Sequence, residues 1–224
     1  MLMPVRAMLV CSSLLATCLG ANAACADPPG RAVNWSACNK KQLMLPGIQM
    51  QGANLSGSIL SAADFTDAKL TRAKFDESDL RHAKLVRVAA KGADFSGALL
   101  TNADLEEAEL SLTDFSEADL QDANLKRATF RGARLGDANL EGANATKADF
   151  TRADLRGTRM NNTLFFDTRL HLAQLQSVDL SKTKGLTQAQ LNTACGDQKT
   201  LLPARLKRPG QWPCAATSWP RKTH

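Results

Sequence analysis

The stretch GADFSGALLTNADLEEAELSLTDFSEADLQDANL (residues 92–125) carries a large apolar residue at every fifth position. These residues are Phe95, Leu100, Leu105, Leu110, Phe115, Leu120 and Leu125. The same stretch holds nine carboxylates and no Lys or Arg. Its acidity is either a binding surface or a consequence of the repeat, so the repeat has to be understood first.

The five-residue period runs without a break from residue 50 to residue 180. Of the 27 central positions divisible by five, 16 are Leu, seven are Phe, two are Met and two are Ala. Two residues before each centre, the 26 positions from 53 to 178 hold only Ala, Ser, Thr or Val. Both positions of the repeat are therefore apolar or small throughout.

A period of five is neither helical nor strictly alternating. In an extended chain, residues two apart face the same way, so the small residue and the centre both point inward. The next inward residue comes three positions later, which requires a corner. Seven glycines lie two residues after a centre, where a corner needs backbone angles that Gly adopts easily: Gly52, Gly57, Gly92, Gly97, Gly132, Gly142 and Gly157. The pattern predicts short extended sides joined by bends and stacked into coils.

The tripeptides at 63–65 (Ala-Asp-Phe), 103–105 (Ala-Asp-Leu) and 138–140 (Ala-Asn-Leu) resemble those of the pentapeptide-repeat proteins. The resemblance implies an all-β fold, a right-handed quadrilateral parallel β-helix with 20 residues per coil. We expect about seven coils in this solenoid, followed by a short capping helix. In that register, Phe75, Phe95 and Phe115 should stack in one column, and Phe130 should lie on Phe150.

The position just before each centre holds Asp nine times and Asn four times between residues 54 and 179. A short Asp or Asn side chain can accept a hydrogen bond from a nearby backbone N–H group at a turn. We therefore interpret these residues as structural. This interpretation accounts for Asp94, Asp104, Asp114 and Asp119 of the opening stretch.

Residues 1–23 have the pattern of a cleavable signal peptide. A single Arg6 precedes an apolar run over residues 7–20, and Ala21 and Ala23 are small residues before a cleavage site. The run is shorter than the roughly 20 residues that span a bilayer, so no transmembrane segment is expected after leader removal. A lipid anchor at Cys25 is disfavoured because Asn22 stands where an aliphatic residue is required. The sequence predicts a periplasmic or secreted protein, cut after about Ala23.

Four cysteines remain after the leader, in one local pair at each end of the chain. We predict disulfides between Cys25 and Cys38 and between Cys195 and Cys214, because an exported chain meets an oxidising compartment. The spacing matches no zinc motif, and no Cys-x-x-Cys occurs. Neither metal binding nor thiol chemistry is expected.

The segments at the two ends of the repeat are predicted to be caps, because open β edges invite aggregation. Residues 24–49 are interpreted as an off-phase N-terminal cap with Trp35 over the first coil. Residues 181–224 are interpreted as a C-terminal cap and a basic tail. Within them, Thr187 and Gln190 form a capping-box pattern that predicts a helix from about residue 188 to 195, with Gly196 as its stop. Leu186 and Leu191 should be buried against the last coil.

The charge is unevenly distributed along the chain. Residues 50–180 hold 16 Lys or Arg and 20 Asp or Glu, a net charge of −4. The remaining residues hold 12 basic and two acidic side chains, a net of +10. The tail residues Arg205, Lys207, Arg208, Arg221 and Lys222 could bind anionic polymers or lipid headgroups, although a solvated tail is the simpler interpretation.

No catalytic, metal or cofactor site is expected from the sequence. The histidines are His82, His171 and His224, and the first two fall in different columns several coils apart. There is no phosphate-binding glycine loop and no paired-His zinc motif. The outward positions of the repeat are mostly polar. A few hold apolar residues and form a possible partner surface, with Phe166 as the strongest candidate: Ile59, Leu99, Leu112, Leu164, Phe166 and Leu172.

The leading hypothesis is a non-enzymatic exported solenoid that acts as a structural or protein-binding scaffold for an unidentified protein or envelope component. A first alternative follows from the resemblance, since some pentapeptide-repeat proteins are DNA mimics that bind topoisomerases and protect against quinolones. That role needs a continuous acidic face and access to cytoplasm, so it is disfavoured, and nucleic acid is not expected as a partner. A second alternative is an envelope or host-surface interaction protein that uses the basic tail.

Overall fold

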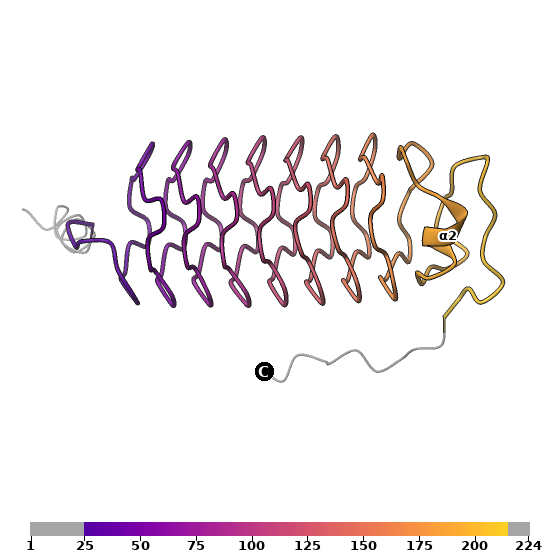
Figure 1. Ribbon diagram of the computed structural model, residues 1–224, viewed down its shortest axis with the longest axis horizontal. Coiled ribbons are helices and arrows are strands. Elements are labelled where there is room, and N and C mark those ends of the chain that lie inside the picture. The colour runs from indigo at the N-terminus through magenta and orange to yellow at the C-terminus, as the bar shows by residue number, and fades with distance from the viewer. Residues whose placement is uncertain (1–24, 215–224) are drawn as a thin grey trace, which may run out of the picture.

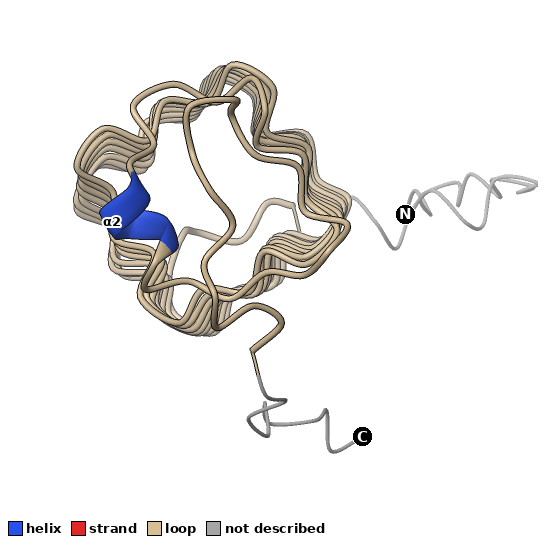
Figure 2. Ribbon diagram, turned by 90° about the vertical axis from the view of Figure 1, so that its right-hand side faces the viewer, coloured by secondary structure: helices blue, strands red, loops and turns tan. Residues whose placement is uncertain are grey.

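Parallel β-bridges join residues that lie 20 apart in the sequence, beginning with Asn34 and Asn54. Bridged positions recur every five residues, at 34, 39, 44 and 49, so each coil has four sides. The computed structural model describes residues 25–214, in which the coils stack into a rod (Figure 1) and enclose a four-sided core (Figure 2). Each side contributes a single bridging residue, and no longer strand forms within these residues. The expected parallel β-helix with a 20-residue register is confirmed.

The corners are four-residue turns with a left-handed residue in the third place. In a typical corner, the N–H of Ala63 donates to the carbonyl of Leu60 at 3.0 Å, and Ala62 between them has φ 57°. This is the geometry of a type II turn, which requires positive φ at that place. The same residue donates its N–H to the next coil, as Ala62 does to Arg81 at 2.9 Å. These inter-coil bonds offset the cost of holding so many non-glycine residues in this region.

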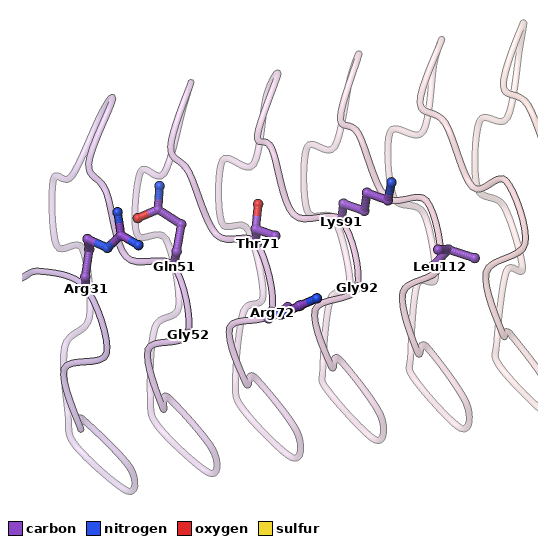
Figure 3. Close-up of a pocket in the computed structure, with 8 residues that line it drawn as sticks. All are labelled: Arg31, Gln51, Gly52, Thr71, Arg72, Lys91, Gly92 and Leu112. Atoms are coloured by element: carbon purple, nitrogen blue, oxygen red, sulfur yellow. The ribbon is translucent and has the colours of Figure 1, made fainter. Parts of the chain in front are cut away.

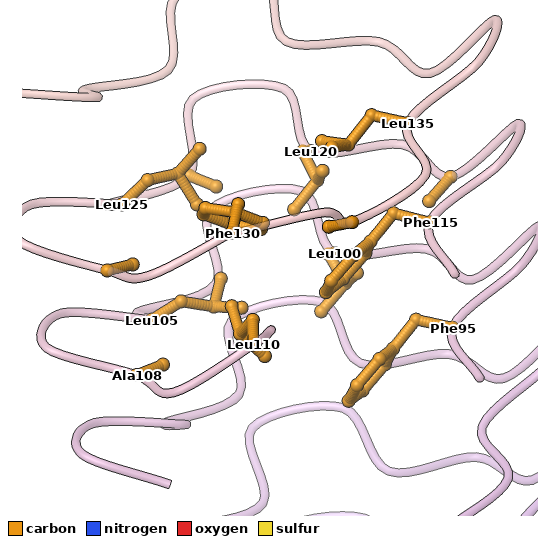
Figure 4. Close-up of a cluster of buried hydrophobic side chains, with 14 of the residues drawn as sticks. Phe95, Leu100, Leu105, Ala108, Leu110, Phe115, Leu120, Leu125, Phe130 and Leu135 are labelled. Carbon is orange, nitrogen blue, oxygen red and sulfur yellow. The ribbon is translucent and has the colours of Figure 1, made fainter. Parts of the chain in front are cut away.

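The rod interior is built from the two inward positions of every pentad. Phe75 and Phe115 lie on either side of Phe95, with ring centroids 4.8 Å apart and nearly parallel planes. Phe130 lies on Phe150 at the same centroid distance. Figure 4 shows Phe115 above Phe95, and Leu120 above Leu100 in a neighbouring column. The predicted columns are confirmed, and the alanine positions between them are fully buried.

The capping role of the Asp and Asn position is also confirmed. All nine Asp and four Asn side chains accept a hydrogen bond from the backbone N–H two residues later. For example, Asp94 Oδ1 accepts from the Ser96 N–H at 3.0 Å and from the Ser96 hydroxyl at 2.7 Å. Thr66 and Arg81 donate side-chain hydrogen bonds that hold the pKa of Asp64 and Asp79 below the usual value.

The N-terminal segment differs from the expected off-phase cap. Residues 34–49 already follow the coil register, and Trp35 and Leu45 are buried centres. The pattern is hidden in the sequence because the small-residue position holds larger side chains here: Val33, Cys38, Leu43 and Ile48. Three of these are only partly buried, so their extra volume projects beyond the packed interior. The Trp35 indole N–H donates to the carbonyl of Asp27 at 3.0 Å, which holds residues 25–30 on the first coil.

The C-terminal segment covers the last coil, as expected. Helix α2 (Gln188–Leu191) has the predicted capping box between Thr187 and Gln190, and Leu191 is buried. The Gln190 amide donates to the carbonyls of Phe165 and Thr168 at 2.9 and 2.8 Å. Seen end-on in Figure 2, α2 and the chain that follows it lie across the end of the rod. Backbone groups of the last coil are thereby satisfied rather than left as an open edge.

The predicted helix end was wrong. α2 stops at Leu191 because Cys195 forms a bridge with Gln174 and its carbonyl accepts the Leu175 N–H at 2.6 Å. Gly196 is not a helix stop. It leaves room for the Trp212 ring, which would collide with any side chain at this position.

Both predicted disulfides are present. Cys25 pairs with Cys38 and Cys195 pairs with Cys214, with Cα atoms 5.6 and 5.5 Å apart. One bond ties the chain before the first coil, and the other ties the segment that covers the last coil. The predicted leader and the tail residues Arg221 and Lys222 lie outside the described residues. None of the helical structure in residues 25–214 is long and apolar enough to cross a membrane.

Candidate functional site: a basic corner of the rod

The described residues contain no cluster of three His, Cys, Asp or Glu side chains placed to hold a metal ion. His82 lies in the line of turn pairs 41–42, 61–62 and 81–82, and His171 lies in the line that includes 151–152, so the two are at different corners of the coil. His224 lies outside the described residues. Neither described histidine has a partner histidine near it for acid–base chemistry.

The six apolar residues expected to form a partner surface are spread over four parts of the coil. Ile59 and Leu99 belong to one ladder and are separated by Asp79. Leu164 lies in a second ladder, beside Lys184. Leu112 and Leu172 lie at a third place, a corner, and three coils apart.

The remaining member of the set, Phe166, is half exposed, and its ring lies against Gly185, where any side chain would collide with it. It belongs to the region that covers the end of the rod. The structure therefore brings together no single apolar patch from these six residues.

Most rod arginines pair with carboxylates. Arg87 reaches Asp67 at 2.7 Å, and Arg127 reaches Glu107 at 3.0 Å, both across one coil. Five further arginines make comparable contacts: Arg81, Arg131, Arg134, Arg156 and Arg169. These ion pairs are largely exposed and each contributes little to stability, but they neutralise the walls on which they lie.

One corner of the rod differs from the other three in its charge. We call it the basic corner, and it consists of the turn pairs 31–32, 51–52 and so on to 171–172. These 16 residues include Arg31, Arg72, Lys91, Arg131 and Arg152 and no Asp or Glu, a net charge of +5. The adjacent corner, from 36–37 to 176–177, has four acidic residues and one Arg, a net of −3. A net positive charge is thus found along one line of a rod whose overall charge is negative.

A groove follows the basic corner over its whole length. Its first part, about 660 Å³, runs from Arg31 to Leu112, and its second part, about 410 Å³, runs from Lys91 to His171. The two parts share Lys91 and Leu112, so they adjoin along the same corner. Figure 3 shows the first part, with one turn pair from each successive coil along the same line.

Glycines alternate with large side chains along the groove. At the third position of the turn, where φ is positive, Gly52, Gly92 and Gly132 alternate with Arg72, Leu112 and Arg152. A side chain at Gly132 would come within 3.0 Å of Leu112, so the glycine leaves the room in which that leucine lies. Leu112 is 62% exposed in the middle of the groove. The alternation gives the corner a series of hollows rather than a smooth edge.

The cations of the basic corner are mostly unpaired. In the part of the chain that the structure describes, the side chains of Arg31, Arg72, Lys91 and Arg152 make no hydrogen bond or salt bridge. Arg131 contacts Asp149 at 3.8 Å, and that carboxylate also receives Arg169 at 3.4 Å. Burial raises the pKa of Asp149, but hydrogen bonds from Thr151 and the nearby arginines outweigh it and leave the pKa lowered.

The carboxylates on the flanking walls are already engaged. Asp94 caps its own turn, Asp114 receives Arg134 at 3.2 Å, and Asp154 receives Arg156 at both of its oxygens. Glu109, on the other flank, accepts the Ser111 N–H at 3.2 Å. The flanks therefore do little to neutralise the free cations in the groove.

The basic corner was missed in the sequence because its residues are scattered over 140 positions. Reading the chain in rows of 20 would have revealed it. The tail that sequence reasoning did select is partly used for structure. Arg205 donates to the carbonyl of Leu186 at 3.0 Å, and Arg208 donates to the carbonyls of Gln198 and Thr200.

Several known proteins share this repeat. The family described as pentapeptide repeats matches residues 48–85, 93–132 and 123–162, with eight copies. A pentapeptide repeat protein from the Arabidopsis thaliana thylakoid lumen is 33% identical, over 52% of this chain and 70% of its own, with a TM-score of 0.24. A search of the curated proteins finds no match.

Two solved structures cover more of the chain at lower identity. HetL, described as involved in heterocyst differentiation regulation in the cyanobacterium Nostoc sp. strain PCC 7120, is 24% identical over 80% of this chain and 95% of its own, with a TM-score of 0.35. QnrB1, a plasmid-mediated fluoroquinolone resistance protein, is 17% identical over 80% and 85%, with a TM-score of 0.43. The eight matched repeat copies and the 20-residue register establish that the chain belongs to the pentapeptide-repeat family.

Proposed function

We propose that this protein is a non-enzymatic, exported scaffold that binds an anionic partner along its basic corner. In this proposal the rod is a right-handed solenoid of about seven repeat coils between two disulfide-tied ends. It works in the periplasm or outside the cell after loss of residues 1–23. Its rigidity lets the groove present fixed charges to the partner without a conformational change.

The observation that carries the proposal is the line of largely unpaired cations at the basic corner. Four of its five cations have no carboxylate partner, whereas six arginines elsewhere on the rod are paired. Clustered charge of one sign along a groove attracts a partner of opposite sign and speeds its association. The basic corner therefore fits a binding role better than a structural one.

Export is supported by the two disulfides and by the leader pattern. Disulfides persist in oxidising compartments and are rare in the cytosol. Each bond closes a short loop at one end of the rod, with sequence separations of 13 and 19 residues. Both positions suit a protein that must resist unfolding from its ends.

The DNA-mimic alternative needs a continuous acidic face. Asp94, Asp104, Asp114 and Asp119 of the opening stretch accept hydrogen bonds from their own turns. The corner from 36–37 to 176–177 has only four carboxylates along its eight turn pairs. The charge distribution therefore favours a partner that is anionic rather than one that recognises DNA-like acidity.

The proposal is tested by expressing the full chain with a C-terminal tag in a bacterium and separating the cell fractions. We expect the protein in the periplasm or medium, starting at about Ala24, with no thiol reacting until a reductant is added. A variant lacking residues 1–23 is the matched control and should stay inside the cell. Intact Met1 and reactive thiols in the cytoplasmic fraction would contradict export.

The binding half of the proposal needs a separate measurement. The purified mature protein is passed over immobilised anionic and cationic polymers at low and high salt. We expect salt-sensitive retention on the anionic matrix, and equal retention by a variant truncated after Cys214. Loss of retention with the tail would assign binding to the tail and reject the basic corner.

A further inference from the structure

We propose that the basic corner binds a linear acidic polysaccharide in which charged sugars are separated by neutral ones. The inference rests on the proposed binding role and names the chemical class of the partner. It follows from three properties of the groove, which are its direction, the spacing of its charges and the side chains between them.

The groove runs parallel to the rod axis and is open along its length. Seven successive bridges lead from Asn34 to Gln174, so the basic corner is roughly 34 Å long at about 4.8 Å per coil. A site of this shape accommodates an extended chain molecule. A small ligand would leave most of the groove unused, and a globular protein would contact it at only one or two coils.

The positive charges form clusters along this line. Arg72 and Lys91 lie on successive coils, and Arg131 and Arg152 form a second such pair three coils further on, roughly 14 Å away. The two pairs are separated by the neutral turn pair 111–112. A polymer with a charge on every unit would place anions against this neutral stretch, whereas a polymer with spaced charges would not.

The neutral positions offer what a sugar needs. Hydroxyl and amide groups line the groove between the cations, at Gln51, Thr71, Ser111 and Thr151. The Ser111 hydroxyl can donate and accept hydrogen bonds with sugar hydroxyls, whereas the hydroxyls of Thr71 and Thr151 already donate within the protein and can accept them. Leu112 is 62% exposed and supplies an apolar surface for the C–H face of a sugar ring.

Single-stranded nucleic acid is a poorer fit to the same groove. Proteins that bind single strands stack the bases on aromatic side chains along a basic groove. Among the residues that line this groove, the only ring is that of His171, at one end. A lipid surface is also a poorer fit, because a flat array of headgroups would engage the protruding cations but not the hollows.

The experiment measures binding of the purified mature protein to hyaluronan decasaccharide, which carries one carboxylate per two sugars. The groove variant is Arg72→Asn, Lys91→Gln and Arg152→Asn, since Asn tolerates the positive φ at 72 and 152. The matched control removes the same charge from other corners, with Lys41→Gln, Lys126→Gln and Lys147→Asn. Both variants should melt within a few degrees of wild type, because none of the six side chains makes a salt bridge.

We expect the groove variant to bind hyaluronan at least about tenfold more weakly at ~50 mM salt, and the control to bind within about twofold of wild type. The slope of log K against log salt should decrease for the groove variant alone. Leu112→Asn leaves the charge unchanged and should weaken hyaluronan binding without changing that slope. The affinity should rise with oligosaccharide length until the chain spans the groove.

Oligo(dT) and vesicles containing anionic lipid are the competing probes. Equal or tighter binding of either one, or an equal loss in the groove variant and the control, would overturn the proposal. These outcomes are independent of export and of anionic binding in general. A protein that is retained on an anionic matrix but prefers oligo(dT) would keep the scaffold role and reject the polysaccharide.

Discussion

At the scale of single residues, the acidity of the opening stretch is a property of the turns. Asp94, Asp104, Asp114 and Asp119 each accept a backbone N–H two residues later. Of the others, Glu107 pairs with Arg127, and Glu106 accepts a hydrogen bond from the Asn124 amide. The repeat therefore explains most of the carboxylates that looked like a binding surface.

Replacing a capping carboxylate separates the two roles. We expect Asp94→Ala to lower the free energy of unfolding by about 1 kcal/mol, because the Ser96 N–H loses its acceptor. Asp94→Asn keeps an acceptor oxygen and should cost much less. Urea denaturation of both variants tests this, and equal losses would mean that the charge, and not the hydrogen bond, matters.

The capping aspartates also set the response to acid. The pKa values of Asp64 and Asp179 are lowered mainly by hydrogen bonds from Thr66 and Ser181, and that of Asp79 by one from Arg81. A carboxyl whose pKa is lowered by folding stabilises the folded state at pH values above its unfolded-state pKa of about 3.9. This stabilisation is lost as the pH falls below that value and towards the folded-state pKa. We expect stability to be flat from about pH 5 to 7 and to decline below about pH 4.

The pH effect is checked by urea denaturation as a function of pH. A variant with Asn at residues 64, 79 and 179 is the comparison, since Asn keeps the acceptor and removes the titration. Its stability should change less in acid than that of wild type. An identical acid decline in the two proteins would show that other groups cause it.

At the scale of elements, the stacked columns of like side chains hold neighbouring coils in register. Phe95 is fully buried between Phe75 and Phe115, and every coil contributes one residue to each column. A slip of one residue would move every inward side chain to the outside. The columns therefore specify the 20-residue register as well as the hydrophobic core.

Truncating the central phenylalanine should open a cavity that the neighbouring coils cannot close. We expect Phe95→Ala to lower the free energy of unfolding by about 3–5 kcal/mol, and Phe95→Leu by clearly less. Leu99→Ala, at a 41% exposed position four residues away, is the control and should cost under about 1 kcal/mol. Thermal and urea denaturation report both, and a small effect at Phe95 would contradict close packing of the column.

At the scale of the whole molecule, the ends differ from the middle because the backbone N–H and C=O groups of each coil find their hydrogen-bond partners on the neighbouring coils. At the last coil, Asp197 takes the place of a further coil and accepts the N–H groups of Ser177, Lys199 and Thr200. The Trp212 indole N–H donates to the carbonyl of Ala194 at 2.7 Å and holds the covering segment down. Fraying from either end would expose edges that can pair with other chains.

The disulfides should matter most at these ends. In the loop-entropy account, closing loops of 13 and 19 residues stabilises by about 3 kcal/mol each. We expect Cys25→Ser with Cys38→Ser, and Cys195→Ser with Cys214→Ser, each to lower the melting temperature. Hydrogen exchange should then increase first at the affected end, and uniform exchange along the rod would contradict end fraying.

The sequence by itself determined the repeat, its inward positions, the turn-capping role of Asp and Asn, and both disulfide pairs. These features depend on local chemistry that recurs every five residues, so one chain contains many copies of the same signal. The first coil was not predicted, because Val33, Leu43 and Ile48 stand where the repeat usually has alanine. The predicted length of α2 was wrong because Cys195 forms a β-bridge with Gln174 and cannot belong to the helix. Only the tertiary structure showed that Arg31, Arg72, Lys91 and Arg152 border a groove and lack carboxylate partners, because stacking makes neighbours of residues that lie about 20 positions apart in the chain.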